Sequence, residues 1–224
     1  MIRAVLFDAT GTLIHLRESV GTTYAQLAHR YGVEIPAARL DAAFTRVFRR
    51  MPPMAFPGVA SGHIPERERH WWRALVMATF EEADATQRFT DFDRCFDQLF
   101  DHYAEPAAWE LAPDIHETLA KLRQRGVRTG IVSNFDYRLP RILDAFGLTP
   151  LLDVVLLSAD VGAAKPDPRI FAAAVERLGV EASEAVYVGD DADDDIAGAR
   201  AAGLRGIDVT SLPTLRAVVG LVDS

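Results

Sequence analysis

Residues 4–12 read Ala-Val-Leu-Phe-Asp-Ala-Thr-Gly-Thr, an apolar run that stops at an aspartate and turns at a glycine. Short apolar runs that end in a turn are typical of strands buried in a parallel sheet. A carboxylate at the end of such a strand can attack phosphorus as a nucleophile, and a glycine lets the backbone turn close to a substrate. We therefore predict that Asp8 ends a buried strand at a substrate site, with Gly11 close to the substrate.

The same pattern recurs along the chain and predicts four more strands, at residues 127–132, 154–157, 185–188 and 206–209. Helical patterns lie between them, at residues 113–126, 168–179 and 193–203. This alternation predicts an α/β fold, a doubly wound, Rossmann-like parallel sheet. Ligands of such sheets bind beyond the carboxyl ends of the strands, which is where we expect Asp8, Ser133, Asn134 and Asp190.

The strand pattern is absent between the first strand and residue 113. Four amphipathic helical stripes replace it, beginning at Tyr24, Leu40, Trp72 and Phe92. We predict a helical insert of residues 16–108 in a core domain of residues 1–15 and 109–224. The middle of the insert, residues 51–65, is rich in proline and glycine and predicts a loop, of a length that often forms a functional lid.

Three further groups of polar residues follow predicted strands. Ser133 and Asn134 offer hydroxyl, amide and backbone N–H groups to phosphate oxygens. Lys165 supplies a compact positive charge that can steady both a nucleophilic carboxylate and a phosphoryl group. Residues 190–195 hold five aspartates, which repel one another unless a cation lies among them, and hard oxygen ligands suit Mg²⁺. We predict Mg²⁺ as the cofactor, bound by Asp190 and Asp195.

The remaining aspartates of that cluster have a simpler interpretation. Asp191, Asp193 and Asp194 lie at the start of a predicted helix, where carboxylates complement the helix dipole. We therefore expect them to be solvated residues of a helix N-terminus.

Four strings resemble the motifs of the haloacid dehalogenase (HAD) superfamily in order and over nearly the whole chain: FDATGTL (7–13), VSN (132–134), KPDP (165–168) and VGDDADDD (188–195). The insert is similar to the helical cap of that superfamily. The fuller strings SNFDYRL (133–139) and KPDPRIF (165–171) resemble most the group called haloacid dehalogenase-like hydrolase domain-containing protein 3. The resemblance implies a hydrolase.

The resemblance also implies roles for individual residues. It implies four catalytic residues: Asp8 as the nucleophile, Thr12 to orient it, Ser133 to bind phosphate and Lys165 as the motif lysine. It implies four Mg²⁺ ligands: Asp8, Asp190, Asp195 and the backbone carbonyl of Thr10. The implied reaction is hydrolysis of a small phosphorylated metabolite through an aspartyl-phosphate at Asp8.

One position departs from the phosphatases of the superfamily. They carry a second aspartate two residues after the nucleophile, which protonates the leaving group, and here that residue is Thr10. A threonine hydroxyl is a poor acid at neutral pH, and general acid–base catalysis contributes about 10²–10⁴-fold. His15 and His63 are the nearest candidate replacements, although exposed structural roles fit both histidines better.

This departure leaves three functions open. A slow Mg²⁺-dependent phosphatase or phosphotransferase is favoured by the aspartate-rich last motif. A metal-free 2-haloacid dehalogenase is the first alternative, because such enzymes also lack the second aspartate and carry the similar string FDAYGTL. The second alternative is a catalytically weak HAD fold that serves as a binding or regulatory module.

Composition restricts the environment and the partners. The 224 residues have a net charge of −8, which favours solubility and argues against a nucleic-acid partner. Cys95 is the single cysteine, so no internal disulfide is possible and a cytoplasmic location is expected. We expect Cys95 to be a packed core residue. No segment suggests a signal peptide or a membrane span, and both a monomer and a homodimer remain open.

Overall fold

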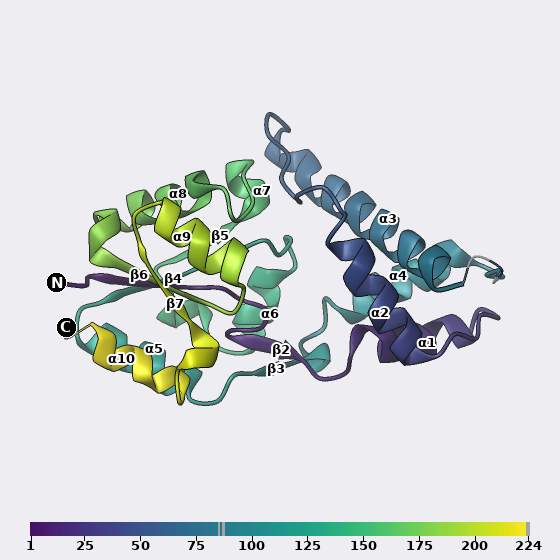
Figure 1. Cartoon of the computed structure of the whole chain (residues 1–224), viewed down its shortest axis with the longest axis horizontal. Coiled ribbons are helices and arrows are strands. Elements are labelled where there is room, and N and C mark those ends of the chain that lie inside the picture. Colours follow the sequence, from purple (N-terminus) through teal and green to yellow (C-terminus); the bar gives the residue numbers. More distant parts are fainter. Residues whose placement is uncertain (85, 87, 223–224) are drawn as a thin grey trace. The chain divides into compact units, whose positions relative to one another are not determined.

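The computed structural model of the chain describes residues 1–84, 86 and 88–222. It divides into two compact units (Figure 1). The core unit comprises Met1–His15, Met54–Ser61 and Glu110–Ser224, and the helical unit comprises Leu16–Pro53 and Gly62–Trp109. The observed division differs from the predicted one chiefly at Met54–Ser61, which lies inside the predicted insert but packs with the core unit.

A five-stranded parallel sheet forms the centre of the core unit. Its order is β5 (Val154–Leu157), β4 (Arg128–Ser133), β1 (Ala4–Phe7), β6 (Ala185–Gly189) and β7 (Arg205–Asp208). Strand β1 lies in the middle and its four residues have no exposed surface, which explains why it is apolar throughout. All five predicted strands are confirmed, with small differences at their ends.

Helices cover both faces of the sheet, so the predicted doubly wound α/β fold is confirmed. Figure 1 shows α8 (Pro168–Leu178) and α9 (Gly198–Ala201) on one face and α5 (Ile115–Gln124) and α10 (Val218–Leu221) on the other. The predicted single helix at residues 193–203 is wrong in one respect, because the chain forms a π-helical segment, Ala192–Ala197, before α9. Single π-helical turns often lie at functional sites.

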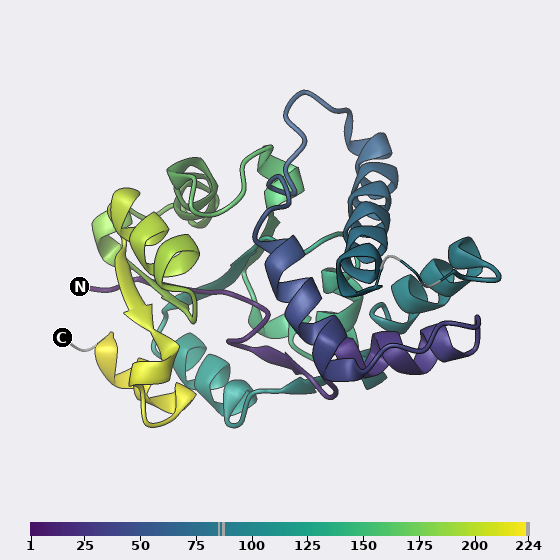
Figure 2. The ribbon, with the colours of Figure 1, turned by 45° about the vertical axis from the view of Figure 1, so that its right-hand side comes forward.

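The register of the sheet brings the sequence motifs to one edge. Phe7 at the end of β1 lies level with Ile131 of β4 and with Val188 of β6. The residues that follow these strands therefore emerge together at the carboxyl edge, which in Figure 2 lies away from the N-terminus. Two short helices continue from this edge: α6 (Leu139–Ala145) after β4 and α7 (Ser158–Val161) after β5.

Four helices form the helical unit. They are α1 (Val20–His29), α2 (Ala37–Phe48), α3 (Ile64–Asp84) and α4 (Phe92–His102), and α1 and α3 each pack against both α2 and α4 (Figure 2). The predicted apolar stripes meet in one cluster, in which Tyr24 stacks on Phe80 with ring centroids 5.6 Å apart. Cys95 is buried in this cluster and burial raises the pKa of its thiol to about 12. The expected core role of Cys95 is confirmed.

The boundary between the units falls in two short strands and around one loop. Strands β2 (Ile14–Leu16) and β3 (Trp109–Leu111) pair with each other. The loop predicted at residues 51–65 is shorter than expected, since a 3₁₀ turn begins at Ser61 and α3 at Ile64. The backbone of this loop is held by the core unit, where Ser158 Oγ donates a 2.5 Å hydrogen bond to the Met54 carbonyl.

A membrane-spanning helix would need a long apolar segment. Among the residues placed in the structure, none of the helices has the length and hydropathy to cross a bilayer.

Candidate active site

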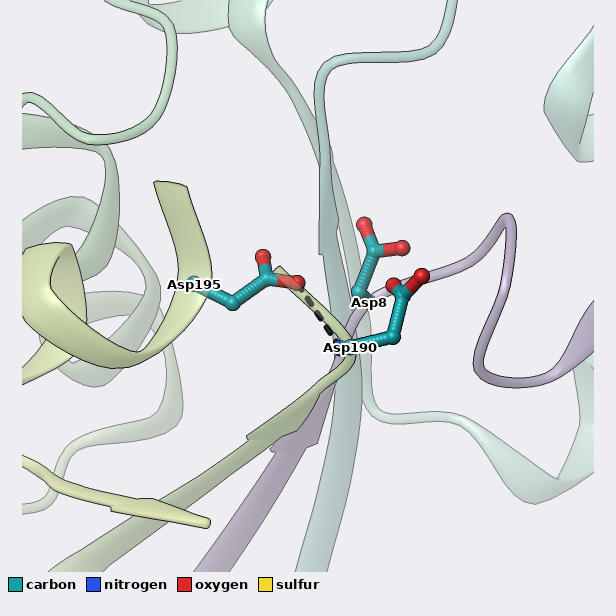
Figure 3. A group of neighbouring side chains, drawn as sticks. All are labelled: Asp8, Asp190 and Asp195. Carbon is teal, nitrogen blue, oxygen red and sulfur yellow. Dashed lines mark hydrogen bonds between the residues drawn. The ribbon is translucent and has the colours of Figure 1, made fainter. Parts of the chain in front are cut away.

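Three carboxylates meet at the carboxyl edge of the sheet. Asp8 follows β1, Asp190 follows β6, and Asp195 lies in the π-helical segment. Each offers an oxygen, and these oxygens lie within 4.8 Å of one another (Figure 3). The side chains of Asp8 and Asp195 are buried and that of Asp190 is exposed. Such a set of hard oxygen donors fits a divalent cation.

A buried lysine lies against two of these carboxylates. Lys165 Nζ donates to Asp8 Oδ1 and to Asp195 Oδ1, each at 2.5 Å. The backbone of Lys165 is held in turn by Asn134, whose Oδ1 accepts from the Lys165 N–H at 2.8 Å and whose Nδ2 donates to the Lys165 carbonyl at 3.1 Å. The sequence had suggested Asn134 as a substrate ligand; in the structure its amide fixes the loop that carries the lysine.

Asp195 is the most heavily hydrogen-bonded member of the cluster. Its Oδ1 accepts from Lys165, and its Oδ2 accepts from the backbone N–H groups of Asp190 and Asp191, each at 3.1 Å. Figure 3 shows the bond from the Asp190 backbone. These donors fix the orientation of the carboxylate and the turn after β6, so Asp195 organises the site in addition to contributing charge.

Two glycines allow the backbone to approach the carboxylates. Gly11 has φ +91°, in the left-handed region that favours glycine, and a Cβ there would lie 2.3 Å from Asp190 Oδ2. A Cβ on Gly189 would lie 2.3 Å from Asp195 Oδ2. The sequence predicted that Gly11 would lie near the substrate; the structure places it against Asp190. Gly189 was not singled out from the sequence, although it closes its strand.

Burial and the neighbouring charges shift the pKa values of the site residues. The pKa of Asp8 is raised from its ordinary value of 3.8 to about 6: burial is the main cause and the charge of Asp195 adds to the shift, while Lys165 opposes it. Burial and the charge of Asp195 also raise the pKa of Asp190. Burial lowers the pKa of Lys165, but the charges of Asp8 and Asp195 outweigh it and the net pKa is raised. Lys165 therefore remains an ammonium ion at neutral pH.

The net charge of the site favours binding of a divalent cation. Above the pKa of Asp8, three carboxylates and one ammonium leave two negative charges unbalanced. A cation with two positive charges would balance them, and Asp8 and Asp190 would be the principal carboxylate ligands, because Asp195 already accepts several hydrogen bonds. The residues present therefore fit the predicted Mg²⁺.

The other predicted site residues, Ser133, Thr12 and Thr10, differ in burial and in hydrogen bonding. Ser133 ends β4, is buried, and its Oγ accepts from the Phe135 N–H at 3.2 Å. Thr12 is buried, and its Oγ1 has no hydrogen-bond partner among the described residues. An unpaired buried hydroxyl is costly, so this group is available to a bound ligand. The side chain of Thr10 is exposed, and the roles implied for Thr10, Thr12 and Ser133 stay predictions.

The remaining aspartates of the cluster behave largely as helix-terminal residues. Asp191 Oδ1 accepts hydrogen bonds from the backbone N–H groups of Asp193 and Asp194, at 2.9 and 2.8 Å. Asp191 is thus an N-cap, and Asp193 is exposed.

The raised pKa of Asp8 makes cation binding dependent on pH. The folded state holds this proton more tightly than the unfolded chain does, because the pKa is about 6 in place of 3.8. Without a metal ion, the contribution of this carboxyl to stability is therefore greatest below 3.8 and falls as pH rises toward 6. A bound cation reverses this loss, since it needs the ionised form.

We accordingly expect Mg²⁺ to raise the midpoint of thermal unfolding more at about pH 7.5 than at about pH 5. At a hundredfold excess over Kd, Mg²⁺ stabilises the folded state by about 2.7 kcal/mol. Thermal unfolding with and without Mg²⁺ at the two pH values measures the difference. Equal shifts at both values would contradict the placement of Asp8 among the ligands.

Comparison with known proteins places the chain in a family. Residues 2–203 match the haloacid dehalogenase-like hydrolases. The mouse (Mus musculus) haloacid dehalogenase-like hydrolase domain-containing protein 3 is 36% identical, covering 97% of this chain and 86% of the mouse protein. A ribulose-1,5-bisphosphate 5-phosphatase from Halopiger xanaduensis is 33% identical, covering 92% and 84%.

A solved dehalogenase with an intermediate complex is also similar, with 26% identity, a TM-score of 0.69 and coverage of 100% of this chain and 98% of that one. Fold and site together define a hydrolase built on a doubly wound sheet. The chain belongs to the haloacid dehalogenase-like hydrolase family, as its four motifs indicated.

Proposed function

We propose that this hydrolase is a Mg²⁺-dependent phosphoric monoester hydrolase that acts on a small phosphorylated metabolite through an aspartyl-phosphate at Asp8. The observation that carries the proposal is the excess of negative charge at the buried site. Three carboxylates around one ammonium would repel an anionic phosphate ester unless a divalent cation joined them. The similarity to a relative named as a ribulose-1,5-bisphosphate 5-phosphatase also supports a phosphate ester as the substrate.

The proposed reaction has two steps, in which Asp8 is the nucleophile and Lys165 supplies positive charge. An oxygen of the ionised Asp8 forms a bond to phosphorus while the ester bond breaks, and the leaving oxygen takes the bonding electron pair. Water then attacks phosphorus, the bond between phosphorus and Asp8 breaks with its electron pair left on the Asp8 carboxylate, and one proton of the attacking water passes to solvent. Lys165 steadies the nucleophile before the attack through its hydrogen bond to Asp8, and its positive charge would stabilise the negative charge of the phosphoryl group. Mg²⁺, when bound, supplies positive charge to the phosphoryl oxygens.

The departing oxygen receives no proton from residue 10, because Thr10 occupies that place. A leaving group that is stable as an anion does not need this proton, whereas an alkoxide does. The proposed enzyme is therefore slow with alkyl phosphates and faster with aryl phosphates.

A panel of aryl and alkyl phosphate esters, assayed with Mg²⁺ and with excess EDTA, tests the proposal. We expect phosphate release only with Mg²⁺, and aryl esters to turn over about 10²-fold or more faster than alkyl esters, the lower limit for an absent general acid. Release that is unaffected by EDTA would refute the role of the cation. Lack of turnover across the panel, with Mg²⁺ binding intact in thermal unfolding, would favour a binding or regulatory module.

The similarity to a solved dehalogenase supports a second candidate function. In that reaction Asp8 would displace halide from the carbon of a 2-haloacid, and halide leaves without a proton, so the absence of an acid at position 10 is no handicap. Such chemistry has no need for the excess negative charge at the site, which is why we place it second. Halide release that persists in EDTA, without phosphate release from any ester, would establish it.

A further inference from the structure

The ammonium group of Lys165 has three N–H donors, and the structure provides a close acceptor for each. Asp8 and Asp195 take two of them, as described above. The third acceptor is Tyr187 Oη, 3.0 Å from Nζ. A buried ammonium that lacked an acceptor for one of its protons would be destabilised, so the tyrosine completes the environment of the lysine.

Burial, a hydrogen bond and a ring contact hold the side chain of Tyr187 in one position. It lies on β6 and is fully buried, and its hydroxyl donates to the Val132 carbonyl of β4 at 2.8 Å. Because β6 and β4 both pair with β1, the side chain crosses the central strand to make this bond. Its ring packs edge-on against Phe171 of α8, with centroids 5.0 Å apart.

The hydroxyl of Tyr187 accepts a hydrogen bond from Lys165 Nζ through a lone pair of its oxygen. The same hydroxyl has two acceptors for its single proton, the Val132 carbonyl at 2.8 Å and Asp195 Oδ1 at 3.1 Å. Whichever acceptor takes the proton, the oxygen keeps a lone pair for Lys165.

We propose that Tyr187 is a positioning residue that fixes the Lys165 ammonium between Asp8 and Asp195. Both carboxylates attract the ammonium, and the neutral hydroxyl provides a third point that determines where Nζ lies and how its protons are directed. A charge that acts on a transition state must be held in place before the reaction. The kinetic consequence of this assignment rests on the proposed function, whereas the placement of the ammonium does not.

The sequence makes a direct observation of this ammonium possible, because its lysines are Lys121 and Lys165 alone. The side chain of Lys121 is 42% exposed and that of Lys165 is 5% exposed. In protein with ¹⁵Nζ-labelled lysine, NMR should therefore show one slowly exchanging ammonium signal, that of Lys165, beside the rapidly exchanging Lys121.

Tyr187→Phe removes the hydroxyl and keeps the ring against Phe171. We expect hydrogen exchange of the Lys165 ammonium to accelerate about tenfold and kcat for an aryl phosphate to fall about tenfold, the equivalent of one hydrogen bond to a charged group. KM should change less than about twofold, because the lysine acts on the transition state more than on substrate binding. Tyr24→Phe, which removes the hydroxyl of another buried tyrosine in the helical unit, should leave both measurements unchanged.

Several results would overturn this assignment. The first is that wild-type protein shows no slowly exchanging Lys165 signal. The second is that Tyr187→Phe folds and the hydrogen exchange of Lys165 is unchanged. The third is that the wild-type enzyme hydrolyses aryl phosphates as proposed and Tyr187→Phe has the same kcat. If wild-type protein hydrolyses no phosphate ester, the proposed function fails and the NMR comparison still decides the role of Tyr187. If Tyr187→Phe does not fold, a nuclear Overhauser contact between the Tyr187 ring and the Lys165 ε-methylene in wild-type protein supports the placement, and its absence rejects it.

Discussion

Asp8→Asn is expected to lower kcat for an aryl phosphate by at least about 10⁴-fold, because an amide cannot form the covalent bond to phosphorus. The variant should remain folded. The carboxyl it replaces is buried with a pKa raised to about 6, so a neutral side chain of the same shape suits the site in the absence of a metal ion. Steady-state assays with Mg²⁺ and a thermal unfolding curve measure both expectations.

Asp193→Asn is the matched control for this experiment. It removes the same charge from the same acidic cluster, but the side chain of Asp193 is exposed and we have assigned it no part in binding or catalysis. Its kcat should stay within about twofold of the wild-type value, as expected for an exposed surface substitution. Comparable losses in the two variants would show that overall charge, and not a nucleophile at position 8, governs the activity.

Thr10→Asp is expected to raise turnover of alkyl phosphates by about 10²–10⁴-fold, the usual contribution of a general acid. The side chain of Thr10 is exposed at the site, so a carboxyl group there should cost little stability. Aryl phosphates, whose leaving groups need no proton, should gain much less. The ratio of aryl to alkyl turnover in wild-type and variant enzymes is the quantity to compare.

Thr10→Asn separates the proton from the shape of the side chain. Asparagine has nearly the size of aspartate but cannot donate the carboxylic proton, so this variant should show no gain. If Thr10→Asp also failed to gain activity, with Mg²⁺ binding intact, the missing acid would not be what limits the enzyme. Equal rates for aryl and alkyl esters in the wild type would indicate that another acid, for which His15 is a candidate, already supplies the proton.

The central strands of the sheet, β1 and β6, were predictable because they are buried along their whole length. Burial makes such a strand a nearly continuous apolar run, and the turn after it is marked by polar residues or glycine. Strands β2 and β3 were missed because three residues, Ile14–Leu16 and Trp109–Leu111, are too few to show a period. The π-helical segment at Ala192–Ala197 cannot be told from α-helix in the sequence, because it continues the helical pattern.

The sequence predicted the site residues that follow strands or lie in recognisable motifs, and it missed the others. Asp8, Lys165, Asp190 and Asp195 follow strands or lie in recognisable strings, and the structure brings them together. Tyr187 was missed because its contacts depend on a side chain that crosses β1, a relation that no sequence spacing reveals. The affiliation of Met54–Ser61 with the core unit was missed for a similar reason, because the Ser158–Met54 hydrogen bond joins segments far apart in the sequence.

The most direct test of the central proposal is to look for the phosphoryl group on Asp8 itself. Wild-type enzyme mixed with an aryl phosphate and Mg²⁺, quenched in acid and digested, should yield the peptide containing Asp8 with one added phosphoryl group. The modification should be labile to hydroxylamine, as an acyl phosphate is, and absent from Asp8→Asn. Phosphate turnover without any modified Asp8 peptide, or modification at another residue, would contradict the covalent mechanism.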